Sequence, residues 1–491
     1  MKQGWYSPFQ RVFAIATAAL LAATPVNAAS HTVEAATKPG EPWKEYPVRT
    51  LDDLPAAIRS ATNTPLSRFG GWAERKLKAT GFFYTTNHAG RWWFVDPEGC
   101  LFLQAGVASV KTILTPRARE ALKRNFTNET GWAEATTTLL RQNGFNGLGG
   151  WADADQLRAV ANSLPYTRIW NFMGAYGRKR GGTFQQPGHN GYPNDCIFVF
   201  DPKFEEFCDE HARQLAADKD DPFLLGHFSD NELPFKRDAL KNYLKLPEGD
   251  AGRDTAEKFL RQRHGERATA SAITAHDEED FLALVVGRYF EIVNRAIKKH
   301  DPNHLYLGSR FYGSDLRFPE IFRGCGSHVD VVSVNWYRAW SPDAEKLAMW
   351  TRESGKPVLI TEWYAKGVDS GMGNTGGAGW LVKTQRERGL FYENFTLGLL
   401  ESSNCVGWHW FRYSDNDPAD TTIDPSNRDS NKGLVNNRYE PYSALLASMN
   451  RINSCLYIIA KHVSQTTTDK VSEATAQSTT GKPEKIKPVS N

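Results

Sequence analysis

The sequence lacks any long hydrophobic run after its first 25 residues, so no later segment is long enough to cross a bilayer. The sequence also has no large excess of one charge, because its 59 Lys and Arg residues nearly balance its 56 Asp and Glu residues. The net charge is +3. This small charge gives no reason to expect a nucleic-acid or anionic-membrane partner. We therefore expect a soluble mature protein without a membrane span; the sequence does not determine its oligomeric state.

Cysteine is sparse in this chain of 491 residues, with six widely scattered thiols and no Cys-x-x-Cys pair or Cys/His cluster. The spacing therefore excludes a dense disulfide framework and gives no sign of a zinc site, so we expect neither metal nor cofactor. Several thiols are expected to be plain buried residues, and any pairing stays open. They are Cys100, Cys196, Cys208, Cys325, Cys405 and Cys455.

The N-terminus has the pattern of a cleavable secretory signal. Lys2 and Arg11 precede an apolar run from Val12 to Ala23, and small residues flank a cleavage point near Ala28. We expect a signal peptide over 1–28 and a secreted or periplasmic protein. The rest is expected to divide into a linker and extension packing on a barrel (29–90, polar linker to about 48), a catalytic barrel (91–460) and a disordered Ser/Thr/Lys-rich tail (461–491).

Short β-type runs alternate with longer amphipathic stretches through the middle of the chain, as expected for parallel strands joined by helices. A hairpin over Arg91 to Val95 and the turn after it leads in. An open doubly wound sheet is the alternative, but no Gly-rich dinucleotide turn follows the first strand. We therefore predict a (β/α)₈ TIM barrel. Its strands are expected at Leu101–Val107, Phe145–Gly149, Thr167–Phe172, Phe223–Ser229, His304–Phe311, Val329–Asn335, Pro357–Thr361 and Cys405–Phe411.

Catalytic residues of such barrels lie at the carboxyl ends of the strands. The fourth predicted strand ends in Ser-Asp-Asn-Glu232, and the seventh ends in Thr-Glu362, so two carboxyl groups would face each other across the barrel mouth. Retaining glycosidases need this pair, with one group as the acid and the other as the nucleophile. We assign Glu232 as general acid/base and Glu362 as nucleophile, and we expect the Asn231 amide to bind a sugar hydroxyl.

Other strand ends offer supporting roles, each with a structural alternative. Arg310 could keep the nucleophile ionised or form a structural ion pair, and Tyr337, two residues after Asn335, could hold the nucleophile or fill the core. In the eighth strand, we expect Trp408 and Trp410 near the first sugar subsite, and His409 either binds a hydroxyl or fills a polar gap. The long Gly-rich segment 174–195 is expected to form a wall of the substrate groove.

The same residues resemble the β-agarases of glycoside hydrolase family 50, within the clan of retaining (β/α)₈ hydrolases. The resemblance covers roughly residues 52–453. It rests on Phe69–Trp72, Ala79–Phe83, Trp92–Gly99, Gly144–Asn146, Phe228–Leu233, Gly308–Phe311, Thr361–Trp363 and Gly407–Tyr413. It implies hydrolysis of β-1,4 links in agarose without a catalytic metal, with Glu232 as acid/base and Glu362 as nucleophile.

The resemblance also has departures. Gly150 precedes Trp151 where a polar residue is expected, Trp363 and Tyr364 replace the Phe and His that the family more often shows, and an N-terminal β-sandwich is missing. These positions are expected near the sugar subsites, with Trp151, Asn335 and Trp363 as substrate-binding candidates. A β-galactosidase or another β-glycan hydrolase of the clan therefore remains an alternative, as does a carbohydrate-binding barrel without activity. A metal-dependent hydrolase would need clustered His and Asp ligands that the strand ends lack.

Overall fold

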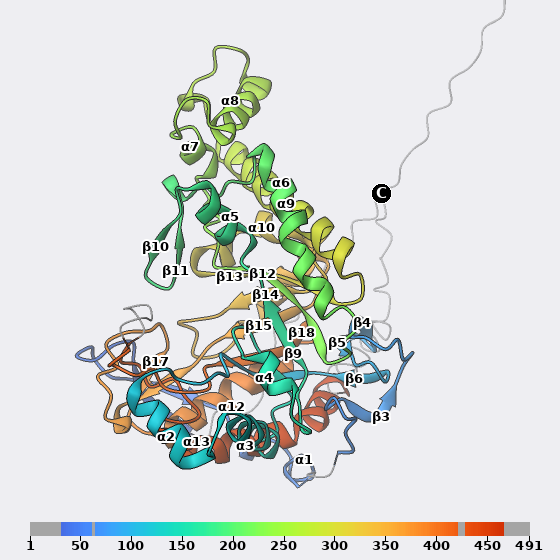
Figure 1. Cartoon of the computed structure of the whole chain (residues 1–491), viewed down its shortest axis with the longest axis vertical. Coiled ribbons are helices and arrows are strands. Elements are labelled where there is room, and N and C mark those ends of the chain that lie inside the picture. The colour runs from blue at the N-terminus through green and yellow to red at the C-terminus, as the bar shows by residue number, and fades with distance from the viewer. Residues whose placement is uncertain (1–30, 61–63, 421–427, 466–491) are drawn as a thin grey trace, which may run out of the picture.

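The computed structural model describes residues 31–60, 64–420 and 428–465, and among these no helix is both long and apolar enough to traverse a membrane. Eight parallel strands close into a barrel (Figure 1), which confirms the predicted fold. Every predicted strand overlaps an observed one. In barrel order they are β7 (Gln104–Ala108), β8 (Gly147–Leu148), β9 (Tyr166–Ile169), β12 (Leu224–Asn231), β13 (Leu305–Tyr312), β14 (Val332–Asn335), β15 (Val358–Glu362) and β18 (Cys405–Phe411).

Helices surround the barrel and alternate with its strands. The longest is α9 (Ala275–His300), which starts at a Thr274–Asp277 capping box and ends in Lys298, Lys299 and His300, charges that favour a helix C-terminus. The other helices are α1 (Ala56–Arg59), α2 (Pro116–Phe126), α3 (Glu129–Gln142), α4 (Ala154–Arg158), α5 (Phe172–Arg180), α6 (Pro202–Ala212), α7 (Ala239–Tyr243), α8 (Ala251–His264), α10 (Pro319–Gly326), α11 (Ala344–Ser354), α12 (Gln385–Glu401) and α13 (Ser443–Ser454).

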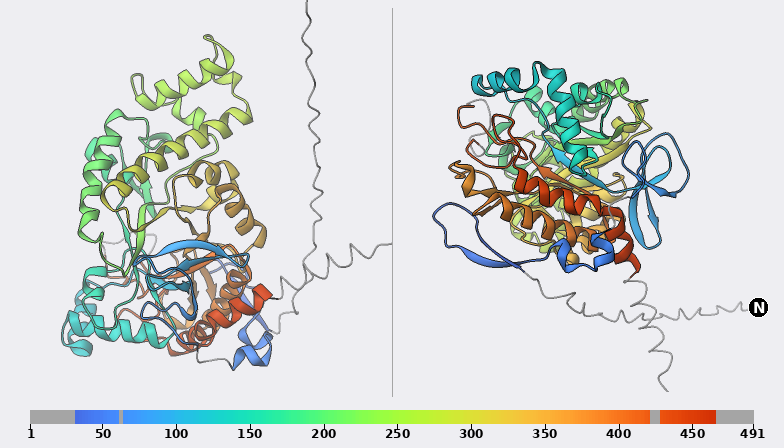
Figure 2. Two further views of the ribbon diagram at one scale, coloured as in Figure 1. Left: turned by 90° about the vertical axis from the view of Figure 1, so that its right-hand side faces the viewer. Right: turned by 90° about the horizontal axis from the view of Figure 1, so that it is seen from below.

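The helices α7 and α8 form an arm between β12 and β13 that stands away from the barrel strands at one end of α9 (Figure 2). Short 3₁₀ turns complete the connections. They are η1 (Leu51–Asp53), η2 (Pro193–Asp195), η3 (Arg213–Ala217), η4 (Ala270–Ala272), η5 (Gly313–Arg317) and η6 (Val368–Ser370).

A four-stranded antiparallel sheet made of β3 (Trp72–Lys76), β4 (Tyr84–His88), β5 (Arg91–Val95) and β6 (Cys100–Phe102) precedes the barrel and contains the predicted lead-in hairpin. Its aromatic side chains Phe94 and Phe102, with Phe69 and Phe83, join the buried cluster that holds Leu225, Leu307 and Leu359 from the barrel strands. Because these barrel residues precede the catalytic ends of their strands, the sheet fills the interior from the side opposite the mouth.

The segment expected to be a linker, residues 29 to about 48, instead contains two strands. β1 (His31–Ala36) and β2 (Lys44–Val48) pair with each other, and β1 also pairs with β17 (Trp380–Val382), next to β16 (Ala365–Gly367). The linker interpretation was wrong because the unpaired edge of β17, more than 340 residues away, supplies the partner that makes this polar segment a strand. This second sheet therefore lies beside the end of β15.

Two further expectations concern the ends of the chain. The signal peptide over 1–28 lies outside the described residues, and so does most of the predicted tail. Residues 461–465 are helical, so regular structure extends slightly beyond the predicted limit of the barrel at residue 460. All six cysteines are buried free thiols.

Candidate active site

A pocket of about 390 Å³ opens at the carboxyl ends of the barrel strands and contains both predicted carboxyl groups. Its lining combines strand ends with three other parts of the chain, which are the β1–β2 connection, a hairpin and a glycine-rich loop. The lining residues are Lys38, Trp151, Pro187, Gly188, His189, Asn231, Glu232, Tyr312, Tyr337, Arg338, Glu362, Tyr364, Thr375, Gly376, Gly377, Ala378 and Phe411.

Glu362 ends β15 and is held by two donors that stabilise its negative charge. The Arg310 guanidinium, fully buried on β13, lies 2.6 Å from one carboxylate oxygen. The Tyr337 hydroxyl donates to the other oxygen. A buried cation and a hydroxyl donor therefore each bond one oxygen of the Glu362 carboxyl group. Arg310 and Tyr337, for which a structural role was the alternative, therefore both contact Glu362.

Glu232 immediately follows β12 and has different surroundings. Its backbone is left-handed, with φ of 53°, and its amide donates to the Arg310 carbonyl at 3.2 Å. Burial, followed by repulsion from the nearby Glu362 carboxylate, raises the pKa of Glu232 to about 8, although the Asn335 amide and Arg310 act to lower it. The carboxyl group therefore holds a proton at neutral pH, as a general acid must.

Asn335, at the end of β14, connects the two strand ends that carry the carboxyl groups. Its side-chain oxygen accepts a hydrogen bond from Thr361 at 2.7 Å, which fixes the orientation of the amide. The amide nitrogen then donates to Glu232 at 2.8 Å and to the Asn231 oxygen at 3.1 Å. The amide nitrogen of Asn231 is therefore directed away from this bond. Asn231 also lines the pocket.

The aromatic residues of the site divide into two groups, and only one group reaches the pocket. Trp151, which has φ of 61°, lines the pocket, and the Arg310 guanidinium lies 4.1 Å from its ring centre. Phe411, the last residue of β18, lies across from it in the same pocket with the two rings in edge contact. The sequence analysis missed Phe411, although its place at a strand end was the available signal.

The structure does not bring Trp363, Trp408 or Trp410 to the pocket, so their expected sugar contacts need correction. Each is at most 1% exposed. Trp363 stacks on Phe395 of α12, and the Trp408 indole donates to Tyr392 of the same helix. The Trp410 indole donates to the Lys432 carbonyl. All three fill the layer between the barrel and its helices, because side chains of one strand alternate between opposite faces.

His409 faces the barrel interior, between Trp408 and Trp410 in sequence, but it lies below the pocket. It is fully buried, and its Nε2 lies 2.7 Å from the Gln104 side-chain oxygen. Burial, followed by repulsion from Arg310, lowers the pKa of His409 to about 3, so the ring is neutral. The alternative role, filling a polar gap in the core, therefore describes this histidine better than sugar binding.

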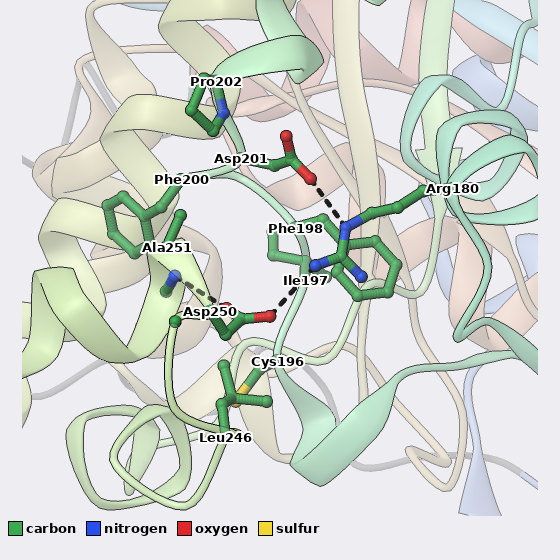
Figure 3. A pocket seen from close by; sticks show the side chains of 12 residues that line it. Arg180, Cys196, Ile197, Phe198, Phe200, Asp201, Pro202, Leu246, Asp250 and Ala251 are labelled. Atoms are coloured by element: carbon green, nitrogen blue, oxygen red, sulfur yellow. Dashed lines mark hydrogen bonds and ion pairs between the residues drawn. The ribbon is translucent and has the colours of Figure 1, made fainter.

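The glycine-rich segment 174–195, expected to be a wall, contains part of α5 and a hairpin of β10 (Phe184–Gln186) and β11 (His189–Gly191). The hairpin tip lines the pocket, and Nδ1 of His189 lies 3.6 Å from Glu232. At the base of the segment, Arg180 bonds both Asp201 and Asp250, at 2.7 and 3.0 Å, beside a separate pocket of about 240 Å³ (Figure 3). Since these acids are paired and also cap helices, we assign that pocket a structural role.

A second wall comes from the glycine-rich loop 371–379 and depends on a buried lysine that the sequence analysis did not single out. Lys366 in β16 is fully buried, and its ammonium group donates to the carbonyls of Asn374, Gly376 and Gly377 at 3.0 to 3.3 Å. Burial lowers the pKa of Lys366 to about 8. Three backbone carbonyls of the wall thus share one cation as their hydrogen-bond donor.

Replacing Lys366 by methionine should raise KM about tenfold with a much smaller change in kcat. The variant removes the ammonium donor from three carbonyls, of which only Gly376 keeps a second bond within the described part of the chain, from the Ser430 hydroxyl; the wall loosens without a change at either carboxyl group. Steady-state kinetics measures KM and kcat separately. Lys258→Met, on the exposed face of α8, serves as the matched control. Equal KM values for the wild type and Lys366→Met would contradict this role.

One cluster of the described residues has the composition of a metal site, although the sequence analysis expected none. His227, Asp301 and His304 are buried, with candidate ligand atoms within 4.8 Å of one another. The Trp170 indole donates to Nδ1 of His227, so the proton of that ring lies on Nε2, facing Asp301 at 2.8 Å. A protonated nitrogen cannot bind a metal, and Nδ1 of His304 also bonds Asp301. The cluster fits a hydrogen-bonded network.

The chain is similar to known β-agarases and to solved structures of glycoside hydrolase family 50. Beta-agarase B of Vibrio sp. (strain JT0107) is 25% identical over 511 residues, covering 82% of this chain and 51% of the relative. Beta-agarase A of the same strain is 28% identical over 375 residues, covering 67% and 36%. No family model matches. The crystal structure of BpGH50 superposes with a TM-score of 0.77 at 28% identity, over 88% of this chain and 96% of that one. These findings support a β-agarase-like protein of glycoside hydrolase family 50.

Two further findings limit what the similarity to family 50 shows. The chain spans about half of beta-agarase B and about a third of beta-agarase A. The structure of the agarase AgWH50C shares the fold, with a TM-score of 0.68 at 24% identity over 82% of this chain and 68% of that one. These similarities show the fold, so the chemistry and the substrate have to be argued from the residues of the pocket.

The sequence departures from the family 50 pattern lie at or beside the pocket. A β-carbon added at Gly150 would lie 3.5 Å from the Arg310 guanidinium, an ordinary van der Waals contact, so a small side chain would fit at this position beside the cation that bonds Glu362. Tyr364 lines the pocket, and its ring leaves no space for a side chain at Gly377 or Gly379. Tyr364 thus shapes the glycine-rich wall, whereas Trp363 faces the helices.

Proposed function

We propose that the protein is a retaining glycoside hydrolase that cleaves β-galactosidic links of an agarose-like galactan. The proposal rests on one observation: two carboxyl groups in one pocket have surroundings that favour opposite charge states. Glu362 is surrounded by donors that stabilise an anion, and Glu232 is buried where it keeps a proton at neutral pH. A nucleophile and a general acid require these two states.

The mechanism follows from these states in two displacements. A carboxylate oxygen of Glu362 attacks the anomeric carbon as the bond to the leaving oxygen breaks, and that oxygen takes the proton of Glu232. Glu232, now a carboxylate, removes a proton from water, whose oxygen attacks the same carbon and releases Glu362. Tyr337 and Arg310 stabilise the Glu362 carboxylate before and after this cycle. Two inversions at one carbon give net retention.

The substrate class rests on the pocket and on the relatives. Trp151 and Phe411 offer two ring faces, and apolar sugar faces stack on such rings, while Asn231 and His189 offer polar groups. The matched relatives from Vibrio sp. are beta-agarases. Because the chain covers only part of each, another β-galactoside or β-glycan stays the second candidate. Export, expected from residues 1–28, suits a polymer that cells cannot take up whole.

A carbohydrate-binding barrel without activity is a weaker candidate, because binding alone gives no reason to bury a protonated Glu232 beside Glu362. The deciding experiment incubates the purified protein with agarose, neutral agaro-oligosaccharides and an aryl β-galactoside, and measures new reducing ends or released aryl alcohol. We expect release from the agarose-derived glycans that is lost in Glu362→Gln. Binding of these glycans without any release would support the binding protein and remove the hydrolase.

A further inference from the structure

A second cleft of about 590 Å³ adjoins the catalytic pocket and shares Tyr312, Tyr337 and Arg338 with it. It lies between η5, which follows β13, and the residues that follow β14, and it reaches the first turn of α11. Both connections leave the carboxyl ends of neighbouring barrel strands. A glycan chain that places one sugar at the two glutamates can therefore continue into this cleft.

The cleft carries positive charge that the protein itself does not neutralise. Arg317 of η5 and Arg338 line it with exposed side chains, and neither has a hydrogen bond or ion pair with any residue in the described ranges 31–60, 64–420 and 428–465. Lys346 pairs with Asp343 at 3.3 Å. Asp343, which also caps α11 by accepting from the amides of Glu345 and Lys346, is the one acidic residue among the described residues that line the cleft, against Arg317, Arg338 and Lys346.

The backbone at Arg338 is fixed in a conformation that side chains other than glycine rarely adopt, with φ of 62°. Its neighbours on both sides are anchored. The Trp336 amide donates to the Glu362 carbonyl at 2.8 Å, and the Ala339 carbonyl accepts from the Trp380 indole at 3.0 Å. The Trp340 indole donates to the Pro47 carbonyl at 2.8 Å. Surrounding contacts thus hold the strained residue at the junction of the two pockets, as is common where strain serves a site.

We propose that this cleft binds an oxyanion substituent of the glycan, a sulfate ester or a carboxylate, on a sugar next to the bond that is cleaved. The proposal rests on the proposed function, which places the glycan at Glu232 and Glu362. Two guanidinium groups that approach one oxyanion give charge-assisted, directional hydrogen bonds, and sulfate and carboxylate oxygens both accept them. Tyr312 and Tyr337 supply the aromatic surface against which the sugar ring lies. Neutral and anionic galactans are then distinguished by this cleft.

The test measures dissociation constants in the full-length Glu362→Gln variant, so that binding is read without turnover. The probes are three agaro-oligosaccharides of equal length: neutral, carrying one sulfate ester per repeat, and carrying one carboxylate per repeat. We expect at least one anionic probe to bind about tenfold tighter than the neutral one. Adding Arg317→Gln or Arg338→Gln should remove most of this preference, and raising the salt concentration should weaken it.

The matched control is Arg352→Gln, an exposed arginine on α11 outside the cleft, which should keep the full preference. Thermal unfolding checks that each variant folds. Three results would overturn the proposal. They are equal binding of the neutral and anionic probes, no binding of any probe, or an unchanged preference when Arg317→Gln or Arg338→Gln is combined with Glu362→Gln. The sulfate and carboxylate probes separate the two oxyanion sources. Arginine-dependent preference in a wild-type protein that cleaves no glycan would retain the cleft and reject the hydrolase.

Discussion

Replacing Glu362 by glutamine is expected to abolish hydrolysis, with kcat/KM falling by more than about 10³-fold. The amide cannot form the glycosyl ester, and it also loses the charge that Arg310 and Tyr337 are arranged to hold. Initial rates on the best glycan of the panel measure the loss. Glu266→Gln is the matched control, because that side chain is 90% exposed and lies in the turn after α8, outside the residues that line the pocket.

The role of Glu362 can also be checked by trapping the covalent bond that it is predicted to form with the sugar. A 2-deoxy-2-fluoro glycoside with a good leaving group slows the second displacement, so the enzyme should accumulate as a glycosyl ester. Peptide mapping by mass spectrometry should place the added mass on Glu362. A rate within about tenfold of wild type in Glu362→Gln, or a label on a different carboxyl group, would contradict its role as nucleophile.

Glu232→Gln is expected to lower kcat/KM by about 10² to 10⁴-fold on substrates whose leaving group needs a proton, the range typical of general acid–base catalysis. In the wild type, burial raises the pKa of Glu232 to about 8, so activity should fall as pH rises through that value. An activated aryl glycoside needs little protonation in the first step. With such a substrate, Glu232→Gln should therefore slow the first displacement less than it does with other substrates. The amplitude and rate of the burst phase measure that step.

The same variant should also be more stable than wild type, and increasingly so at alkaline pH. Burial raises the pKa of Glu232 from 4.5 to about 8 in the folded protein. The folded state thus resists loss of the proton, and wild-type stability is complete below pH 4.5 and declines as pH rises toward 8. Glutamine has no proton to lose. Tm should rise more at pH 9 than at pH 5; an equal or lower Tm at pH 9 would place Glu232 in a solvated site.

Sequence patterns predicted the parts of the site that depend on strand positions. The eight β-type runs, each followed by a helix-like stretch, placed Glu232 and Glu362 at the mouth, since the carboxyl ends of all barrel strands lie on one side. Arg310, Asn335 and Tyr337 follow from the same rule. Each of these residues lies within two residues of the end of its strand and contacts a glutamate.

Two features could not be predicted from the sequence: the side of the strand to which each side chain points, and the contacts between segments far apart in the chain. In β18 the tryptophans 408 and 410 face the helices, while His409 and Phe411 face inward, and a shift of one residue reverses this assignment. The pocket walls depend on contacts far apart in the chain. Strand β1 needs β17, and Lys366 binds a loop with no marked pattern beyond its glycines.

The most direct test of the two-glutamate mechanism is the configuration of the first product. Proton NMR should follow the anomeric signals during the first minutes of hydrolysis, before mutarotation mixes them. Double displacement through Glu362 predicts that the β anomer appears first and the α anomer grows in later. An α anomer as the first product would show a single displacement by water and contradict the assignment of Glu362 as nucleophile.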